Sequence, residues 1–145
     1  MRTWVVIAFL LFTALAGAQR NQEALDALKS RVDSARPEDR PGLCLEVAQR
    51  QLEAADQLYG DGKTDPARAA VQDVVKYAEQ ARDASLKSGK ALKHTEISVR
   101  KMAMKLRDIR RSLSFEDQPP VQAAAQRLED VRTDLLVHMF GKQKK

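Results

Sequence analysis

The sequence predicts an all-α protein, an up-and-down antiparallel bundle of four long helices plus a shorter N-terminal helix. Apolar residues recur at alternating steps of three and four in five segments, and this spacing marks one face of a helix. Short stretches containing proline or glycine separate the segments, and no segment alternates apolar and polar residues as a strand does. Heptad spacing of this kind favours shallow helix crossing angles of about 20°.

The N-terminus has the pattern of a cleavable secretory signal peptide. Arg2 gives a short basic start, residues 4–15 form an apolar run, and residues 16–18 (Ala-Gly-Ala) match the small-x-small site read by signal peptidase. The run is too short for a comfortable membrane span, which takes about 20 residues. We therefore expect residues 1–18 to be removed. Residues 19–145 are then a single domain, periplasmic or secreted, without a transmembrane segment.

The first two helices are separated by prolines. Leu25, Leu28 and Val32 share a face of a helix expected over residues 21–35. The stretch 36–42 contains two prolines, which are tolerated in the first turn of a helix but not in its middle. A second helix therefore starts there and ends near residue 60, where two glycines accept the left-handed conformation of a helix end. Its apolar seam is Leu45, Ala48, Leu52, Ala55 and Tyr59.

The third helix begins after a cap at Thr64 or Asp65, and residues 88–90 break the chain before the fourth helix. So short a connection makes the third and fourth helices antiparallel neighbours. The last helix follows a second break at residues 116–120 and ends near Gly141, before a short basic tail. The third seam is Ala67, Ala70 or Val71, Val74, Ala78, Ala81 and Ser85, and the last is Val121, Ala124, Leu128, Val131, Leu135 and His138.

The fourth helix has the most regular seam and most of the positive charge. Its seam is Leu92, Thr95, Val99, Met102, Leu106, Ile109 and Leu113. Residues 87–111 carry nine Lys/Arg and two acids, a net charge of +7 in a chain of net charge +5. The candidate partner-binding residues are the cations Lys93, Arg100, Lys101, Lys105, Arg107 and Arg111, together with Ile97 and Met104.

Two interpretations of these cations stay open. They attract an anionic partner, an acidic protein or a polyanion of the cell envelope, or they form a solvated face paired with carboxylates on neighbouring helices. The second is the commoner case. Ile97 and Met104 lie opposite the seam, so this helix is either covered on both sides, as the central helix of five, or exposes an apolar partner surface. We favour the central position.

Cys44 is the only cysteine, so no internal disulfide forms. It lies beside Leu45 and Ala48 of an apolar face, and free cysteine is among the most buried residue types. A buried, inert thiol is therefore the favoured interpretation. The alternative is an intermolecular disulfide that links a homodimer.

Motifs for catalysis, metals and nucleic acids are missing. The sequence contains no glycine-rich phosphate loop, nucleophile elbow or His-Glu-x-x-His motif, so we expect no enzyme activity and no cofactor. Residues 92–113 hold no aromatic residue on which a nucleic-acid base stacks. Asp134 and His138, four residues apart, are the only candidate half of a metal site, and haem would need His138 with Met102.

The sequence thus predicts an exported, non-enzymatic helical bundle that binds an anionic partner. Two alternatives remain. One is a carrier of a small ligand, haem or metal, and the other is a structural protein that self-associates.

Overall fold

Five α-helices make up the part of the chain described by the computed structural model, residues 2–141, with side chains described from residue 19 onward. They are α1 (Arg2–Ser34), α2 (Arg40–Gly60), α3 (Thr64–Ser88), α4 (Leu92–Ser112) and α5 (Gln118–Phe140). A 3-10 turn, η1 (Phe115–Asp117), joins α4 to α5, and residues 2–141 contain no strand. The predicted all-α bundle is confirmed.

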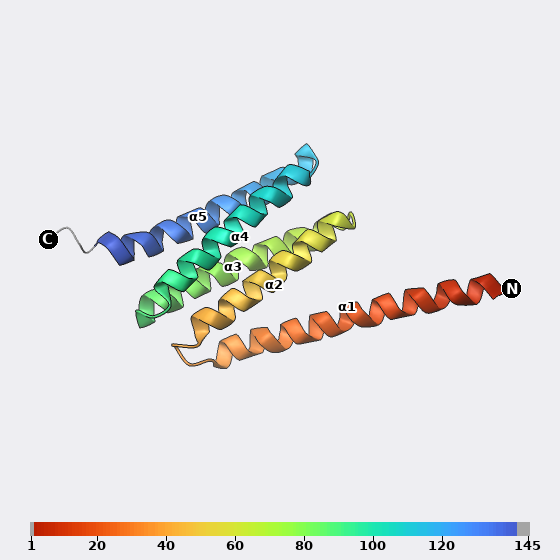
Figure 1. Cartoon of the computed structure of the whole chain (residues 1–145), viewed down its shortest axis with the longest axis horizontal. Coiled ribbons are helices and arrows are strands. Elements are labelled where there is room, and N and C mark those ends of the chain that lie inside the picture. Colours follow the sequence, from red (N-terminus) through yellow and green to blue (C-terminus); the bar gives the residue numbers. More distant parts are fainter. Residues whose placement is uncertain (1, 142–145) are drawn as a thin grey trace.

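Two antiparallel hairpins form the body of the bundle (Figure 1). α2 packs against α3 and α4 packs against α5, while α3 contacts α5 and α2 contacts α4 between the hairpins. α1 lies along α2, and its N-terminal half extends past the end of the hairpins. The C-terminus lies at the opposite end of the molecule from the N-terminus. Short connections therefore set the up-and-down order, as the breaks in the sequence predict, but α3 packs more extensively on α5 than on α4, so the expected pairing of α3 with α4 is met only in part.

α1 is longer than the sequence predicts. The expected helix begins at residue 21, whereas α1 begins at Arg2. Residues 2–20 contain no proline, so nothing in this segment interrupts a helix. Leu25, Leu28 and Val32 bury its inner face against the bundle. The preceding segment is the one predicted to be a signal peptide, and its removal stays a prediction. Within residues 2–141, no helix is both long enough and apolar enough to cross a membrane.

The predicted apolar seams form the core. Leu106 of α4 and Leu128 and Leu135 of α5 are completely buried, and the central positions of every predicted seam are buried with them. Small residues fill the contact of α2 with α3, where Ala55 and Ala78 have no exposed surface. Such small side chains let helix backbones approach closely. The core therefore consists of one continuous apolar cluster shared by all five helices.

The turn between α3 and α4 is held by polar and backbone features. Gly89 ends α3 in the left-handed conformation, with φ of 67°. Ala91 also adopts a positive φ, 61°, which is unfavourable for a residue with a Cβ atom. The buried hydroxyls of Ser85 and Thr95 lie 2.8 Å apart and hydrogen bond across the turn. These contacts set the start of α4 relative to the end of α3.

Cys44 lies in the core of α2 and has no exposed surface. Its thiol lies 3.9 Å from Oε1 of Gln80 on α3, and burial raises its pKa from 9.0 to about 11. The predicted buried thiol is confirmed. An intermolecular disulfide would need this sulfur at the surface, which its position in the folded chain does not allow.

Candidate partner-binding surface on α4

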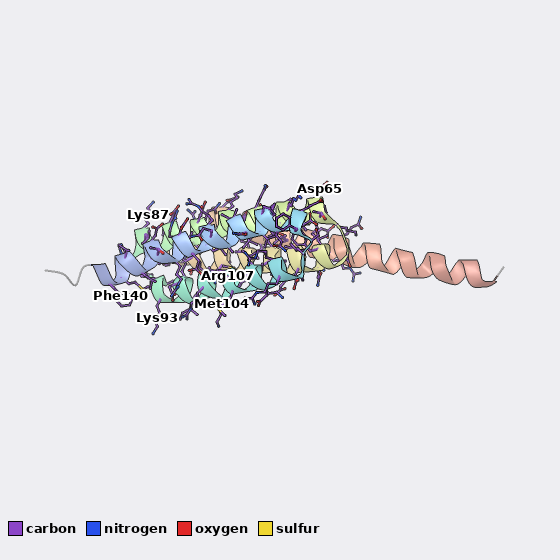
Figure 2. All side chains as sticks on the ribbon, turned by 90° about the horizontal axis from the view of Figure 1, so that it is seen from above. Asp65, Lys87, Lys93, Met104, Arg107 and Phe140 are labelled. Carbon is purple, nitrogen blue, oxygen red and sulfur yellow. The ribbon has the colours of Figure 1, made fainter. Side chains whose placement is uncertain are left out.

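The surface of α4 opposite its buried seam carries a second heptad row. We call the following residues the outward row: Lys93, Ile97, Arg100, Met104, Arg107 and Arg111. Their steps alternate between four and three, so they share one face of the helix. Figure 2 shows the side chains of Lys93 and Met104 projecting along one edge of the molecule, with Phe140 of α5 at the same edge. The row therefore joins cations to apolar side chains on a single exposed ridge.

The expected central position of α4 is wrong. Met104 is 56% exposed, so no helix of the described chain covers this side of α4, while Ile97 is half-buried. α1, the helix that belongs to neither hairpin, packs on α2 instead. The short connection from Ser34 to Arg40 explains this outcome, because it keeps α1 beside the helix that follows it.

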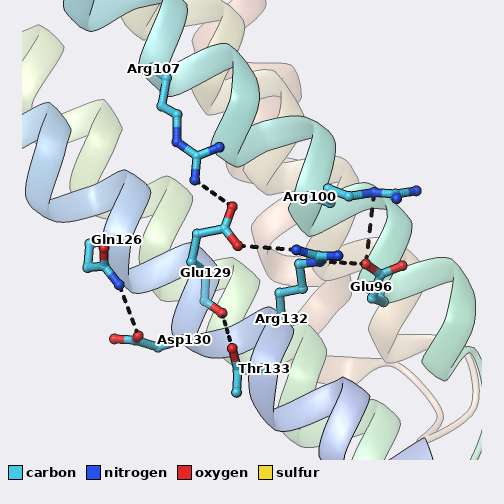
Figure 3. Close-up of polar contacts among 8 residues, drawn as sticks. All are labelled: Glu96, Arg100, Arg107, Gln126, Glu129, Asp130, Arg132 and Thr133. Atoms are coloured by element: carbon cyan, nitrogen blue, oxygen red, sulfur yellow. Dashed lines mark hydrogen bonds and ion pairs between the residues drawn. The ribbon is translucent and has the colours of Figure 1, made fainter.

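A network of ion pairs links the outward row to α5 (Figure 3). Arg107 pairs with Glu129 at 2.7 Å, and Arg132 bridges Glu129 at 3.5 Å and Glu96 at 2.7 Å. Arg100 approaches the same Glu96 carboxylate at 3.9 Å. The hydrogen bond to Glu96 raises the pKa of Arg132. Three arginines thus share two carboxylates, and the network retains a net charge of +1.

Two further cations of the candidate set also have carboxylate partners. Lys105 pairs with Asp56 of α2 at 2.7 Å, and this hydrogen bond raises the pKa of Lys105. Arg111 pairs with Asp108 on α4 itself at 3.2 Å. Of these two cations, Lys105 thus has the carboxylate partner on a neighbouring helix that the solvated-face interpretation expects, and the partner of Arg111 lies on α4 itself.

Lys93 and Lys101 differ from the other candidates. Both are exposed, and neither has a carboxylate within 4.0 Å among residues whose side chains the structure describes. Lys101 lies at the edge of a groove of about 490 Å³ between α2 and α4, whose walls also include Leu52, Glu53 and Met102. Among the six candidate cations, these two lysines have the most freedom to meet an external anion.

Asp134 and His138, the pair considered for a metal, lie on α5 without a third candidate ligand beside them in the described residues. The Asp134 carboxylate accepts a hydrogen bond at 2.9 Å from Arg82 of α3, and His138 is half-buried near the end of α5. In the described part of the chain, no three side chains of metal-binding type gather. Met102, the other residue considered for haem, is packed in the core with 3% of its surface exposed.

Glu96, Glu129 and Arg132 are the polar residues that the sequence interpretation missed. Glu96 is only 7% exposed although it carries a charge. Glu96 precedes Arg100 by four residues, and this spacing predicts an ion pair on one helix. The ion pair of Glu96 with Arg132 of α5 could not be predicted, because the sequences of α4 and α5 do not determine how the two helices are offset.

No known protein family, no characterised protein and no solved structure matches this chain. Function is therefore inferred from the chemistry of the described surface.

Proposed function

We propose that this protein is an exported, non-enzymatic helical bundle that binds an anionic partner through the outward row of α4 and the adjacent Lys101. One observation carries the proposal. No helix within residues 2–141 covers the side of α4 that carries Met104, which is 56% exposed, and four cations of the outward row and Lys101 lie on this side. Cations clustered on one side of a molecule steer anionic partners toward it.

The charge that remains after internal pairing supports the proposal. The α4–α5 network keeps one positive charge in excess, and Lys93 and Lys101 add two more. The apolar run at residues 4–15 followed by Ala16-Gly17-Ala18 supports export. Partners in the cell envelope are therefore the ones that such a protein would meet.

The test is a paired charge reversal. The variant Lys93→Glu/Lys101→Glu changes two cations that have no described carboxylate partner, so it leaves the α4–α5 network in place. The control Arg36→Glu/Lys63→Glu makes the same change of charge at two exposed positions in other loops. Arg100 and Arg107 are unsuitable targets, since a glutamate there would face Glu96 or Glu129.

Binding is measured by capture from an envelope extract at low and high salt, with helicity checked by circular dichroism. We expect the control to bind as the native protein does and the α4 variant to lose binding. Native binding should also weaken at high salt, because salt screens exposed charges. Equal binding by both variants would show that this face of α4 is not the site.

A further inference from the structure

We infer that the anionic partner of α4 is a lipid surface, and that the molecule lies on an anionic bilayer along the edge that carries Lys93, Met104 and Phe140. This inference rests on the proposed function and names its partner. Three features of the described surface favour a bilayer: the shape of the edge, its exposed apolar side chains and the arrangement of its cations.

The edge is a ridge. Two grooves flank the α4–α5 hairpin, one of about 490 Å³ between α2 and α4 and one of about 430 Å³ between α3 and α5. The outward row lines neither of these grooves. Since α4 has 21 residues, its ridge is about 30 Å long at 1.5 Å per residue. A long straight ridge meets a flat surface along its whole length.

Apolar side chains project from the same edge. Met104 is 56% exposed and Phe140 is 61% exposed, and Figure 2 shows both at the edge that carries Lys93. Val137, 62% exposed, lies one turn before Phe140 on α5. A soluble polyanion is held by charge alone and gives such side chains no apolar environment. The boundary of headgroups and acyl chains does, and surface-bound helices combine basic and apolar residues for this reason.

The cations are placed for headgroup contact. Lys93, Arg100 and Arg111 repeat along the ridge on either side of Met104, so they reach several headgroups at once, while the Arg107 side chain is directed toward Glu129 of α5. Each Lys or Arg near an anionic membrane contributes about 1 kcal/mol, which is about a fivefold change in partition. Arg100 and Arg107 keep their donors partly free, since three arginines of the network share two carboxylates.

The experiment places a fluorescent reporter on the ridge of the full chain. Trp4 is the only tryptophan, so a Trp4→Phe background allows a single reporter at Met104→Trp. The matched control is Ala69→Trp, an exposed residue of α3 one turn after Asp65, which Figure 2 shows at the opposite edge. The probes are vesicles of zwitterionic phosphatidylcholine with and without phosphatidylglycerol. We expect the apolar N-terminal segment to associate with vesicles of both compositions, so the measured quantity is the difference between them.

We expect the emission of the reporter at position 104 to shift to the blue with anionic vesicles only, while the reporter at position 69 stays unchanged. Adding Lys93→Glu, which changes a lysine of the ridge itself, should weaken the anionic component of partition by at least about fivefold. Equal responses at the two positions, or no response at position 104, would overturn the inference. Lysine-dependent binding to soluble poly-glutamate without vesicle binding would also overturn it, yet leave the proposed function standing. If the lysine substitution changes binding neither to vesicles nor to poly-glutamate, both this inference and the proposed function are refuted.

Discussion

Two substitutions on α4, only two residues apart, test which faces of this helix are covered. Leu106 has no exposed surface and packs in the core, whereas Met104 is 56% exposed on the outward row. Truncation of a buried leucine to alanine costs about 2–5 kcal/mol, because apolar contacts are lost and a cavity remains. We therefore expect Leu106→Ala to lower the free energy of unfolding by about 3 kcal/mol. Met104→Ala should change it by less than about 0.5 kcal/mol, as exposed substitutions do.

The measurement is urea unfolding of both variants and the native protein, followed by helical circular dichroism. The expected loss for Leu106→Ala corresponds to a fall in Tm of about 10 °C for a domain of this size. The slope of the unfolding curve should be equal in all three proteins, because a similar surface is exposed on unfolding. If Met104→Ala costs more than about 1 kcal/mol, another helix covers this face and the ridge does not exist. If Leu106→Ala is nearly neutral, the assignment of the α4 seam to the core is wrong.

Three further predictions concern the α3–α4 turn and the buried thiol. Ala91→Gly should stabilise the fold by about 0.5–1 kcal/mol, because Ala91 has a φ of 61° and glycine accepts this conformation without strain. Gly89→Ala should destabilise the fold, because Gly89 has a φ of 67°. Changes of the opposite sign in urea unfolding would contradict the described turn. Thr95→Val should cost about 1–2 kcal/mol in the same assay, because the buried Ser85 hydroxyl loses its partner at 2.8 Å; an unchanged midpoint would mean that this hydroxyl finds another partner. Burial raises the pKa of the Cys44 thiol from 9.0 to about 11, so the folded state holds the thiol proton more tightly than the unfolded state does. The stability that this difference contributes is complete below pH 9 and is lost as the pH rises to about 11. Native protein should therefore lose up to about 2 kcal/mol across this window relative to Cys44→Ala, and parallel pH profiles of the two proteins would refute the shift.

The seams were predictable because they depend on local spacing. Val99 and Leu106 stand seven residues apart, about two helical turns, so they lie on the same face of α4, and both are buried in the core. Whether a second helix covers Met104 depends instead on where α1 packs, and the sequence treats Ile97 and Met104 alike although the structure exposes one more than the other. Tertiary placement, rather than periodicity, decided this point.

The ion pairs divide in the same way. A pair on one helix, such as Arg111 with Asp108, follows from a spacing of three. Pairs between helices, such as Arg107 with Glu129, need the offset of α4 against α5, which no residue pattern contains. The sequence therefore places the candidate cations together on one helix, as the structure does. It did not show that, among the six candidate cations, only Lys93 and Lys101 lack a carboxylate partner in the described part of the chain.

The ion pairs that join different helices have a consequence for register. Seams that repeat every seven residues fit one another almost as well after a slip of one heptad, so apolar packing alone leaves several alignments close in energy. Lys105 with Asp56, Arg107 with Glu129 and Arg82 with Asp134 each join one position to one other position. A slip of α4 or of α5 by about 10 Å, seven residues at 1.5 Å each, separates two of these three pairs at once. Exposed pairs add little to stability individually, yet together they let this bundle select one alignment among near-equals.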